Sequence, residues 1–342
     1  MAPDQRSPHS FLHAIRVCFW FTVAIFFLAL GLTVLCFSPA EDKVANSIVL
    51  EATVKPATKS LWRVPDSAAI PRTEKGALIL YGRELVAHTA KYLGPKGTVA
   101  QISNGMNCQN CHLEKGTKLF GNNYSAVASM YPRFRARSGQ IETVEKRIND
   151  CLERSLNGKP LGKNSRELRA ITEYLMWLGK DVEKGTRPAG VGLPELPFLP
   201  RAADPVKGRM IFEARCSECH GHNGEGVRNS DHVEWKYPPL WGPESYNVSA
   251  GLHRLSRFAG YVKANMPYGV TYDKPKLTDE EAWDVAAYVN TMPRPHKKFP
   301  EDWPDLTSKP FDHPFGPYAD TFSEAQHKYG PFAPVKSATY KK

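Results

Sequence analysis

Two short segments of the chain share one pattern of two cysteines followed by a histidine. Residues 108–112 read Cys-Gln-Asn-Cys-His, and residues 216–220 read Cys-Ser-Glu-Cys-His. This C-x-x-C-H pattern is typical of covalent haem c attachment, in which both thiols bond to haem vinyl groups and the histidine ligates the iron. Because the pattern occurs twice, 108 residues apart, we predict two haem c groups, held by Cys108, Cys111 and His112 and by Cys216, Cys219 and His220.

Zinc binding and thiol redox chemistry are the alternatives for such cysteine pairs. A structural zinc site needs two C-x-x-C pairs close together or a distant histidine pair. A thioredoxin-like site needs a βαβ pattern around the cysteines. Each of the two segments instead follows a helical pattern, which favours the haem interpretation.

Met266 is the candidate sixth ligand of the second haem iron. It lies 46 residues after His220 and 22 before Tyr288, between the haem segment and the predicted last helix, where a class I cytochrome c supplies this ligand. A thioether ligand raises the haem potential, which suits a haem that receives electrons and passes them on. The alternative is a methionine packed in the core.

In the first half of the chain, the equivalent position holds a cysteine. Tyr174 corresponds to Tyr288, and Cys151 lies 23 residues before Tyr174 and 39 after His112, with no methionine nearby. We therefore predict that Cys151 is the sixth ligand of the first haem. The alternative is a small buried hydrophobic residue, a role that free cysteines often have.

Basic residues cluster around Cys151 in the sequence. From Tyr131 to Ala170 there are ten Lys or Arg against five Asp or Glu. Positive charge favours the thiolate form of cysteine, which is both the nucleophile and the metal ligand, and it attracts small dianions. The net charge of +10 likewise indicates an anionic substrate, an acidic redox partner or an anionic membrane surface, or simply a solvated basic surface. The nearby basic residues are Arg133, Arg135, Arg137, Lys146, Arg147 and Arg154.

Helical patterns on both sides of each haem segment would position these groups, and they predict an all-α fold. Gly185 to Pro205 contains five prolines and three glycines, which indicates an extended linker. Capping signals mark three of the helix starts. The predicted helices are 75–91, one that starts at Asn164 with Glu167 three residues later, 204–215 with Asp204 as cap, and 278–290 with Thr278 and Glu281 as a capping box.

We predict two class I cytochrome c domains in tandem, joined by a Pro-rich linker and preceded by one transmembrane helix. At 342 residues and 42% hydrophobic content, the chain is long enough for two cores. The predicted parts are a cytoplasmic N-terminus (1–16), a transmembrane anchor or signal (17–38), the first domain with the catalytic haem (41–184), a linker (185–203), the second domain with the electron-transfer haem (204–295), and a Pro- and aromatic-rich tail (296–342) that wraps across a domain surface.

Residues 17–38 form the predicted membrane segment. The segment is 22 residues long without a charge, enough to cross a bilayer as a helix. Arg6 and Arg16 precede it while Glu41 and Asp42 follow, so the N-terminus should stay in the cytoplasm. A cleaved signal peptide is the alternative, although its apolar core is usually only about 7–15 residues. The expected location is the periplasmic side of the bacterial cytoplasmic membrane, or the periplasm after cleavage.

Several segments resemble the dihaem thiosulfate dehydrogenases, over residues 75–295. These segments are 105–112, 131–132, 135–139, 148–155 and 157–161. The resemblance implies that Cys151 ligates the first haem beside the substrate site, and that Arg137, Arg147 and Ser155 line this site. It also implies that two thiosulfates are joined into tetrathionate, or the reverse, with electrons passing from the first haem to the second.

One departure from the family concerns the residue before Met266. Some relatives have a lysine there that ligates the oxidised iron, whereas this chain has Asn265. We therefore expect plain His220/Met266 ligation, and no directional preference is carried over. The expected electron partner is a soluble or membrane-bound c-type cytochrome or a quinone-linked protein, and no nucleic acid is expected.

Three other functions compete with this interpretation. A dihaem electron carrier would need neither Cys151 nor the basic cluster. A haem-thiolate sulfur transferase would attach thiosulfate to a carrier protein and release no free tetrathionate. A dihaem peroxidase would need an open haem face and would consume peroxide.

Overall fold

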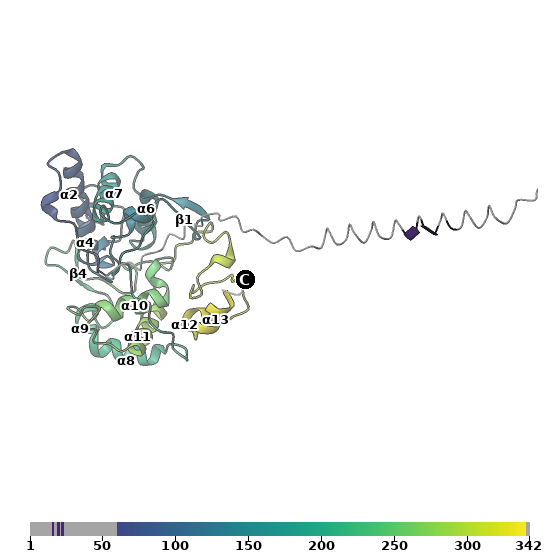
Figure 1. Ribbon diagram of the computed structural model, residues 1–342. Helices are drawn as coiled ribbons and strands as arrows, with labels where there is room; N and C mark the ends of the chain where they lie inside the picture. Colours follow the sequence, from purple (N-terminus) through teal and green to yellow (C-terminus); the bar gives the residue numbers. More distant parts are fainter. Residues whose placement is uncertain (1–15, 17–18, 21, 24–59, 340–342) are drawn as a thin grey trace, which may run out of the picture. The chain divides into compact units, whose positions relative to one another are not determined.

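The structure is a computed structural model that describes Arg16, residues 19–20 and 22–23, and residues 60–339 (Figure 1). The chain divides into two units, Met1–Thr58 and Lys59–Lys342, and both C-x-x-C-H segments belong to the second. The predicted membrane segment, residues 17–38, lies almost wholly outside the described residues. Within the described part of the chain, no helix has both the length and the apolar character needed to span a bilayer.

The second unit is mostly helical, with two small antiparallel β-ribbons. We call residues 60–183 the first lobe, residues 204–295 the second lobe and residues 296–339 the tail. The first lobe contains η1 Ser67–Ala69, α2 Glu74–Ala87, α3 Thr89–Leu93, η2 Cys108–Asn110, α4 Leu113–Gly116, α5 Val127–Met130, β1 Arg133–Arg135, β2 Gln140–Glu142, α6 Val144–Arg154 and α7 Arg166–Leu178. The second lobe contains α8 Pro205–Arg215, α9 Ser217–His220, β3 Val227–Arg228, β4 Trp235–Tyr237, η3 Gly251–His253, α10 Leu255–Asn265 and α11 Asp279–Thr291, and the tail contains η4 Leu306–Ser308, α12 Glu324–Tyr329 and α13 Phe332–Thr339.

Each lobe is built on one close crossing of its first and last long helices. In the first lobe, a Cβ added to Gly82 of α2 would lie 1.9 Å from the Ala170 carbonyl oxygen and 2.8 Å from the Tyr174 Cβ of α7. In the second lobe, α8 and α11 cross in the same way at Gly208 and Tyr288. The structure therefore equates Tyr174 with Tyr288, the correspondence used to locate Cys151.

Replacing Gly208 with alanine should destabilise the second lobe. The added methyl group would lie 1.9 Å from the Asp284 carbonyl oxygen, and such overpacking typically costs about 1–3 kcal/mol. We expect a lower urea midpoint by far-UV circular dichroism. Gly162→Ala is the control, because no described atom lies within 4 Å of its added Cβ. Equal midpoints for the two variants would contradict this account of the crossing.

Capping side chains start the long helices as the sequence predicts. Asp204 accepts hydrogen bonds from two amides of the first turn of α8, and Thr278 and Glu281 form a reciprocal capping box on α11. The start of α7 is one residue later than predicted, because the Ser165 hydroxyl, and not Asn164, accepts from the Leu168 amide at 3.2 Å.

Three features differ from what the sequence predicts. The helix predicted at 75–91 breaks at His88, after which the Ala90 amide donates to the Asn107 side chain at 2.8 Å. The two β-ribbons pair β1 with β2 and β3 with β4. Helices α6 and α10 had no predicted bounds, although they carry Cys151 and lead into Met266.

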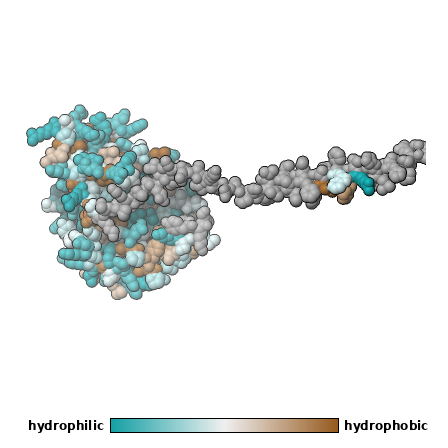
Figure 2. All heavy atoms as spheres, in the orientation of Figure 1, coloured by the Kyte–Doolittle hydropathy of each residue, from teal (hydrophilic) through white to brown (hydrophobic). Residues whose placement is uncertain are grey.

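The lobes have separate hydrophobic cores. Leu85, Leu168 and Leu178 are among the fully buried side chains of the first, and Phe212 and Trp283 among those of the second. On the face seen in Figure 2, hydrophilic side chains predominate and the apolar ones are scattered. Burial of apolar surface therefore stabilises two compact cores, which hold the haem segments between their helices.

Candidate active site

The first haem segment is held by hydrogen bonds that leave its ligand atoms free. The Asn107 amide donates to the Asn110 side chain at 2.7 Å, and the Cys108 amide donates to the Thr89 hydroxyl at 2.9 Å. His112 Nδ1 donates to the Asn122 carbonyl oxygen at 2.5 Å, so the predicted role of iron ligand would fall to Nε2. Burial lowers the pKa of His112 to about 4, so its imidazole is neutral, as a metal ligand must be.

The second haem segment repeats this arrangement. His220 Nδ1 donates to the Pro238 carbonyl oxygen at 2.9 Å, and burial lowers the pKa of its imidazole. Met266 directly follows α10 and lines the same cavity as Cys216, Cys219 and His220. The structure thus brings together all four residues predicted to hold the second haem.

The cavity that Met266 lines has a volume of about 590 Å³. Cys111 of the first segment also lines it, so residues from both haem segments face one space. Trp235 lines it as well, and its buried Nε1 has no hydrogen-bond partner in the part of the chain that the structure describes. A haem with its carboxylates would match both the size and the unpartnered donor.

The side chain of Asn265, the residue before Met266, is hydrogen-bonded to backbone atoms. Its side-chain amide donates to the carbonyl oxygens of Phe120 and Tyr261, both at 3.0 Å, and the residue is 1% exposed. It therefore ties α10 to the first lobe, and an amide offers no strong iron ligand in place of the thioether.

A second cavity, of about 210 Å³, contains the predicted ligands of the first haem. Cys108, His112 and Cys151 all line it, although Cys151 comes from α6, far along the chain from the haem segment. Arg147 lies one turn before Cys151 on the same side of α6 and also lines the cavity. The negative charge of a Cys151 thiolate raises the pKa of the Arg147 guanidinium.

The cavity around Cys151 is strongly cationic. Four arginines line it and, among the described residues, no aspartate or glutamate does. They come from three places in the chain: Arg133 and Arg135 from one face of β1, Arg147 from α6, and Arg187 from the linker. Arg135 Nε lies 3.8 Å from Oε2 of Glu142 in the paired strand. The other three arginines keep the net charge of the cavity positive, which suits small dianions.

Arg137 and Ser155, the other two predicted substrate residues, do not line this cavity. Arg137 Nη1 donates to the Ser249 carbonyl oxygen at 2.9 Å, and its guanidinium lies 5.3 Å from the ring centre of Trp303. Ser155 follows α6, and its amide donates to the Cys151 carbonyl oxygen at 2.8 Å. Their roles at the substrate site remain predictions.

Arg187 is the cavity arginine that sequence reasoning missed. It lies in the linker, which crosses the loop after His112: the Phe120 amide donates to Gly190 O at 2.8 Å and the Asn122 amide to Gly192 O at 2.9 Å. The positive charge of Arg187 is the only signal in the sequence that could have indicated its role. The contacts that place the linker are long-range and involve backbone atoms, so no sequence pattern predicts them.

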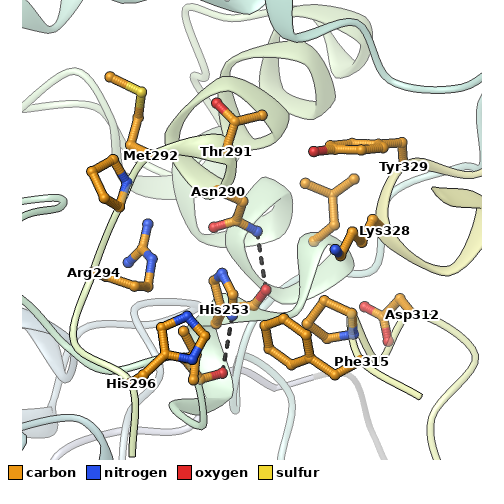
Figure 3. Close-up of a pocket in the computed structure, with 14 residues that line it drawn as sticks. His253, Asn290, Thr291, Met292, Arg294, His296, Asp312, Phe315, Lys328 and Tyr329 are labelled. Atoms are coloured by element: carbon orange, nitrogen blue, oxygen red, sulfur yellow. Dashed lines mark hydrogen bonds between the residues drawn. The ribbon is translucent and has the colours of Figure 1, made fainter. Parts of the chain in front are cut away.

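A third cavity, of about 250 Å³, lies between the second lobe and the tail (Figure 3). His253 and Asn290 lie on one side, where Asn290 Nδ2 donates to the His253 carbonyl oxygen at 3.0 Å. Phe315 and Tyr329 of the tail lie on the other. Among the described residues, no cysteine lines this cavity, so it offers no thiol for haem attachment. It is a gap in the packing of the tail against the second lobe.

Comparison with known proteins places both lobes in described families. The family described as "SoxA/TsdA, cytochrome c domain" matches residues 98–183, and the family described as "Cytochrome c" matches residues 205–293.

Curated relatives match along most of their length. A thiosulfate dehydrogenase of Allochromatium vinosum is 39% identical over 236 residues, which is 68% of this chain and 84% of that protein. A thiosulfate dehydrogenase of Psychrobacter arcticus is 37% identical over 250 residues, 72% of this chain and 73% of that protein. The solved thiosulfate dehydrogenase TsdBA of Marichromatium purpuratum has a TM-score of 0.63 and 32% identity, and the match covers 73% of this chain and 51% of that one.

Proposed function

The chain belongs to the thiosulfate dehydrogenase family, and we propose that it joins two thiosulfate ions into one tetrathionate with release of two electrons. It is an oxidoreductase that carries two covalently bound c-type haems. When bound, these haems supply the one-electron acceptors that the oxidation requires. The reverse reaction, tetrathionate reduction, would use the same site.

We assign the haem-holding residues by lobe. In the first lobe, Cys108 and Cys111 bond to the haem, and His112 and Cys151 are the iron ligands. In the second lobe the corresponding residues are Cys216, Cys219, His220 and Met266. The hydrogen-bonded Nδ1 of each histidine supports this assignment. Cys108, His112 and Cys151 share one cavity, and the four second-lobe residues share the other, which Cys111 also lines.

The observation that carries the proposal is the cationic cavity around Cys151. Two dianions about 5 Å apart repel each other by about 3 kcal/mol even in water. Arg133, Arg135, Arg147 and Arg187 surround the cavity and would offset this repulsion in a fixed arrangement. A simple electron carrier needs no such site.

Cys151 would provide the sulfur chemistry. It lies one turn from Arg147 on α6, and its thiolate would be the nucleophilic form. We propose that Cys151 is both iron ligand and reactive thiol, with Arg137 and Ser155 as outer residues of the substrate site.

The setting of the reaction follows from the expected export of the chain. We propose that the enzyme works on the periplasmic side of the cytoplasmic membrane, with residues 17–38 as anchor, and that a c-type cytochrome or a quinone-linked protein receives the electrons. The charge-free apolar run of that segment supports this location.

Thiosulfate should reduce the haems of the purified, oxidised protein under anaerobic conditions, and sulfate should not. Sulfate has the same charge but no sulfane sulfur, so it controls for simple anion binding. The absorbance of ferrous haem c reports the reduction. An unchanged spectrum with both anions would argue for an electron carrier.

A further inference from the structure

The tail passes from the second lobe to the first and back, and the part that touches the first lobe lies beside the Cys151 helix. We call this part, residues 297–304, the strap. At its start, Lys297 Nζ donates to the Gly158 carbonyl oxygen at 2.7 Å, and near its end the Trp303 amide donates to the Arg137 carbonyl oxygen at 2.6 Å.

Beyond the strap, the tail is fixed to the second lobe. Arg254 Nε donates to Asp312 at 2.7 Å, and the amide of Ala203, a residue of the second core that directly precedes the lobe, donates to the Tyr329 carbonyl oxygen at 2.8 Å. Phe332 of α13 belongs to the second core, and Figure 3 shows Asp312, Phe315 and Tyr329 of the tail around the same cavity as His253 and Asn290 of the second lobe. At the start of the strap, the Ser249 hydroxyl of the second lobe donates to the Lys297 carbonyl oxygen at 3.0 Å. The strap is therefore held at both ends by the second lobe.

Asp302 is the centre of the contact between strap and first lobe. Arg154 donates to it through two parallel hydrogen bonds, from Nη1 to Oδ2 and from Nη2 to Oδ1, each 2.8 Å long. Phe299 lies over the same guanidinium at 3.6 Å, and Arg154 is only 5% exposed. A bidentate pair of this kind, with its guanidinium buried, fixes orientation as well as distance.

A second guanidinium faces the same carboxylate. Arg137 Nε lies 4.0 Å from Asp302 Oδ2, with its guanidinium beside the Trp303 ring. Asp302 thus lies between two arginines, one from α6 and one from the loop between β1 and β2. Without its charge, these two cations would be left facing each other in a largely buried place.

Arg154 lies on the same side of α6 as the two residues proposed to react with or bind the substrate. Arg147, Cys151 and Arg154 are spaced by four and three residues along α6, so they lie along one side of the helix. Rotation of α6 would move all three together. A contact that fixes Arg154 therefore also fixes how Cys151 and Arg147 face the cavity.

We propose that Asp302 of the strap is a positioning residue of the active site, which sets the orientation of α6 and so the presentation of Cys151 and Arg147. This inference rests on the proposed function. The tail lies outside the residues that the two family comparisons match. The proposal makes it part of the site through its contact with α6.

The test compares Asp302→Asn with Asp305→Asn in the full-length haem protein. Asp305 lies in the same tail, but its carboxylate accepts from Thr307 and not from the first lobe. For Asp302→Asn we expect about a tenfold to hundredfold loss of kcat/KM for thiosulfate, since small misplacements of reactive groups have effects of this size. We also expect a second ferric low-spin signal from the first haem by electron paramagnetic resonance, and an unchanged signal from the second haem.

The outcomes separate positioning from simple attachment of the tail. Asp302→Asn could lower the unfolding temperature and yet keep the same kcat/KM and ferric signals as Asp305→Asn. That result would overturn the proposal. If Asp302→Asn yields no folded protein, Arg154→Lys is the deciding variant, because it keeps the charge and loses the bidentate geometry. It should show the same changes to a smaller degree. Unchanged activity and spectra in Arg154→Lys would overturn the proposal. If the wild type fails to oxidise thiosulfate, the proposed function fails, while the ferric spectra still decide the role of Asp302.

Discussion

Replacing Cys151 with alanine should abolish thiosulfate oxidation while both haems remain attached. The thiol lines the same cavity as His112, and no other thiol there is free, among the described residues, once Cys108 is bonded to haem. Loss of a reactive nucleophile typically lowers kcat by at least about a thousandfold. The rate of ferricyanide reduction by thiosulfate measures the loss, and a haem assay gives the number of haems per chain.

A second variant separates the two roles of Cys151. Cys151→Met keeps a sulfur ligand for the iron and removes the nucleophile, so it should stay low-spin and still be inactive. Activity within tenfold of the wild type in Cys151→Ala would contradict the assignment of Cys151 as the reactive group.

Arg147→Met should weaken thiosulfate binding strongly. Methionine preserves most of the side-chain length, so the change removes mainly the charge and the hydrogen-bond donors. Hydrogen bonds to charged groups contribute about 1.5–3 kcal/mol, which corresponds to about a tenfold to hundredfold rise in KM. The same change at Arg169, an exposed residue of α7, should leave KM unaltered.

The effect should lie in the interaction with the dianion and not in the fold. Arg147→Met should keep the unfolding temperature of the Arg169→Met control within a few degrees. A KM equal to that of the control would show that Arg133, Arg135 and Arg187 bind the substrate without Arg147.

Local features of this protein could be predicted from its sequence because neighbouring residues determine them. The two C-x-x-C-H segments, the Asp204 cap and the Thr278–Glu281 capping box each depend on atoms a few residues apart. The correspondence of Tyr174 with Tyr288 was also accessible, because both lobes repeat one helix crossing. That correspondence led to Cys151, which the structure places in the cavity beside His112.

The rest of the site depends on contacts between distant parts of the chain. Arg187 reaches the cavity through a linker that looked like a simple connection, and the strap reaches α6 from a tail expected only to cover a surface. Arg137 illustrates the same limit, since its environment is set by Ser249 and Trp303. No spacing in the sequence encodes such contacts.

The balance between tetrathionate formed and electrons released tests the central claim most directly. Thiosulfate is added anaerobically to the protein with ferricyanide present, and both tetrathionate and ferricyanide are measured. We predict one tetrathionate for every two ferricyanide ions reduced, with no product from Cys151→Ala. Intact haem spectra without tetrathionate would contradict the account and leave an electron carrier, or a transferase that requires a protein acceptor.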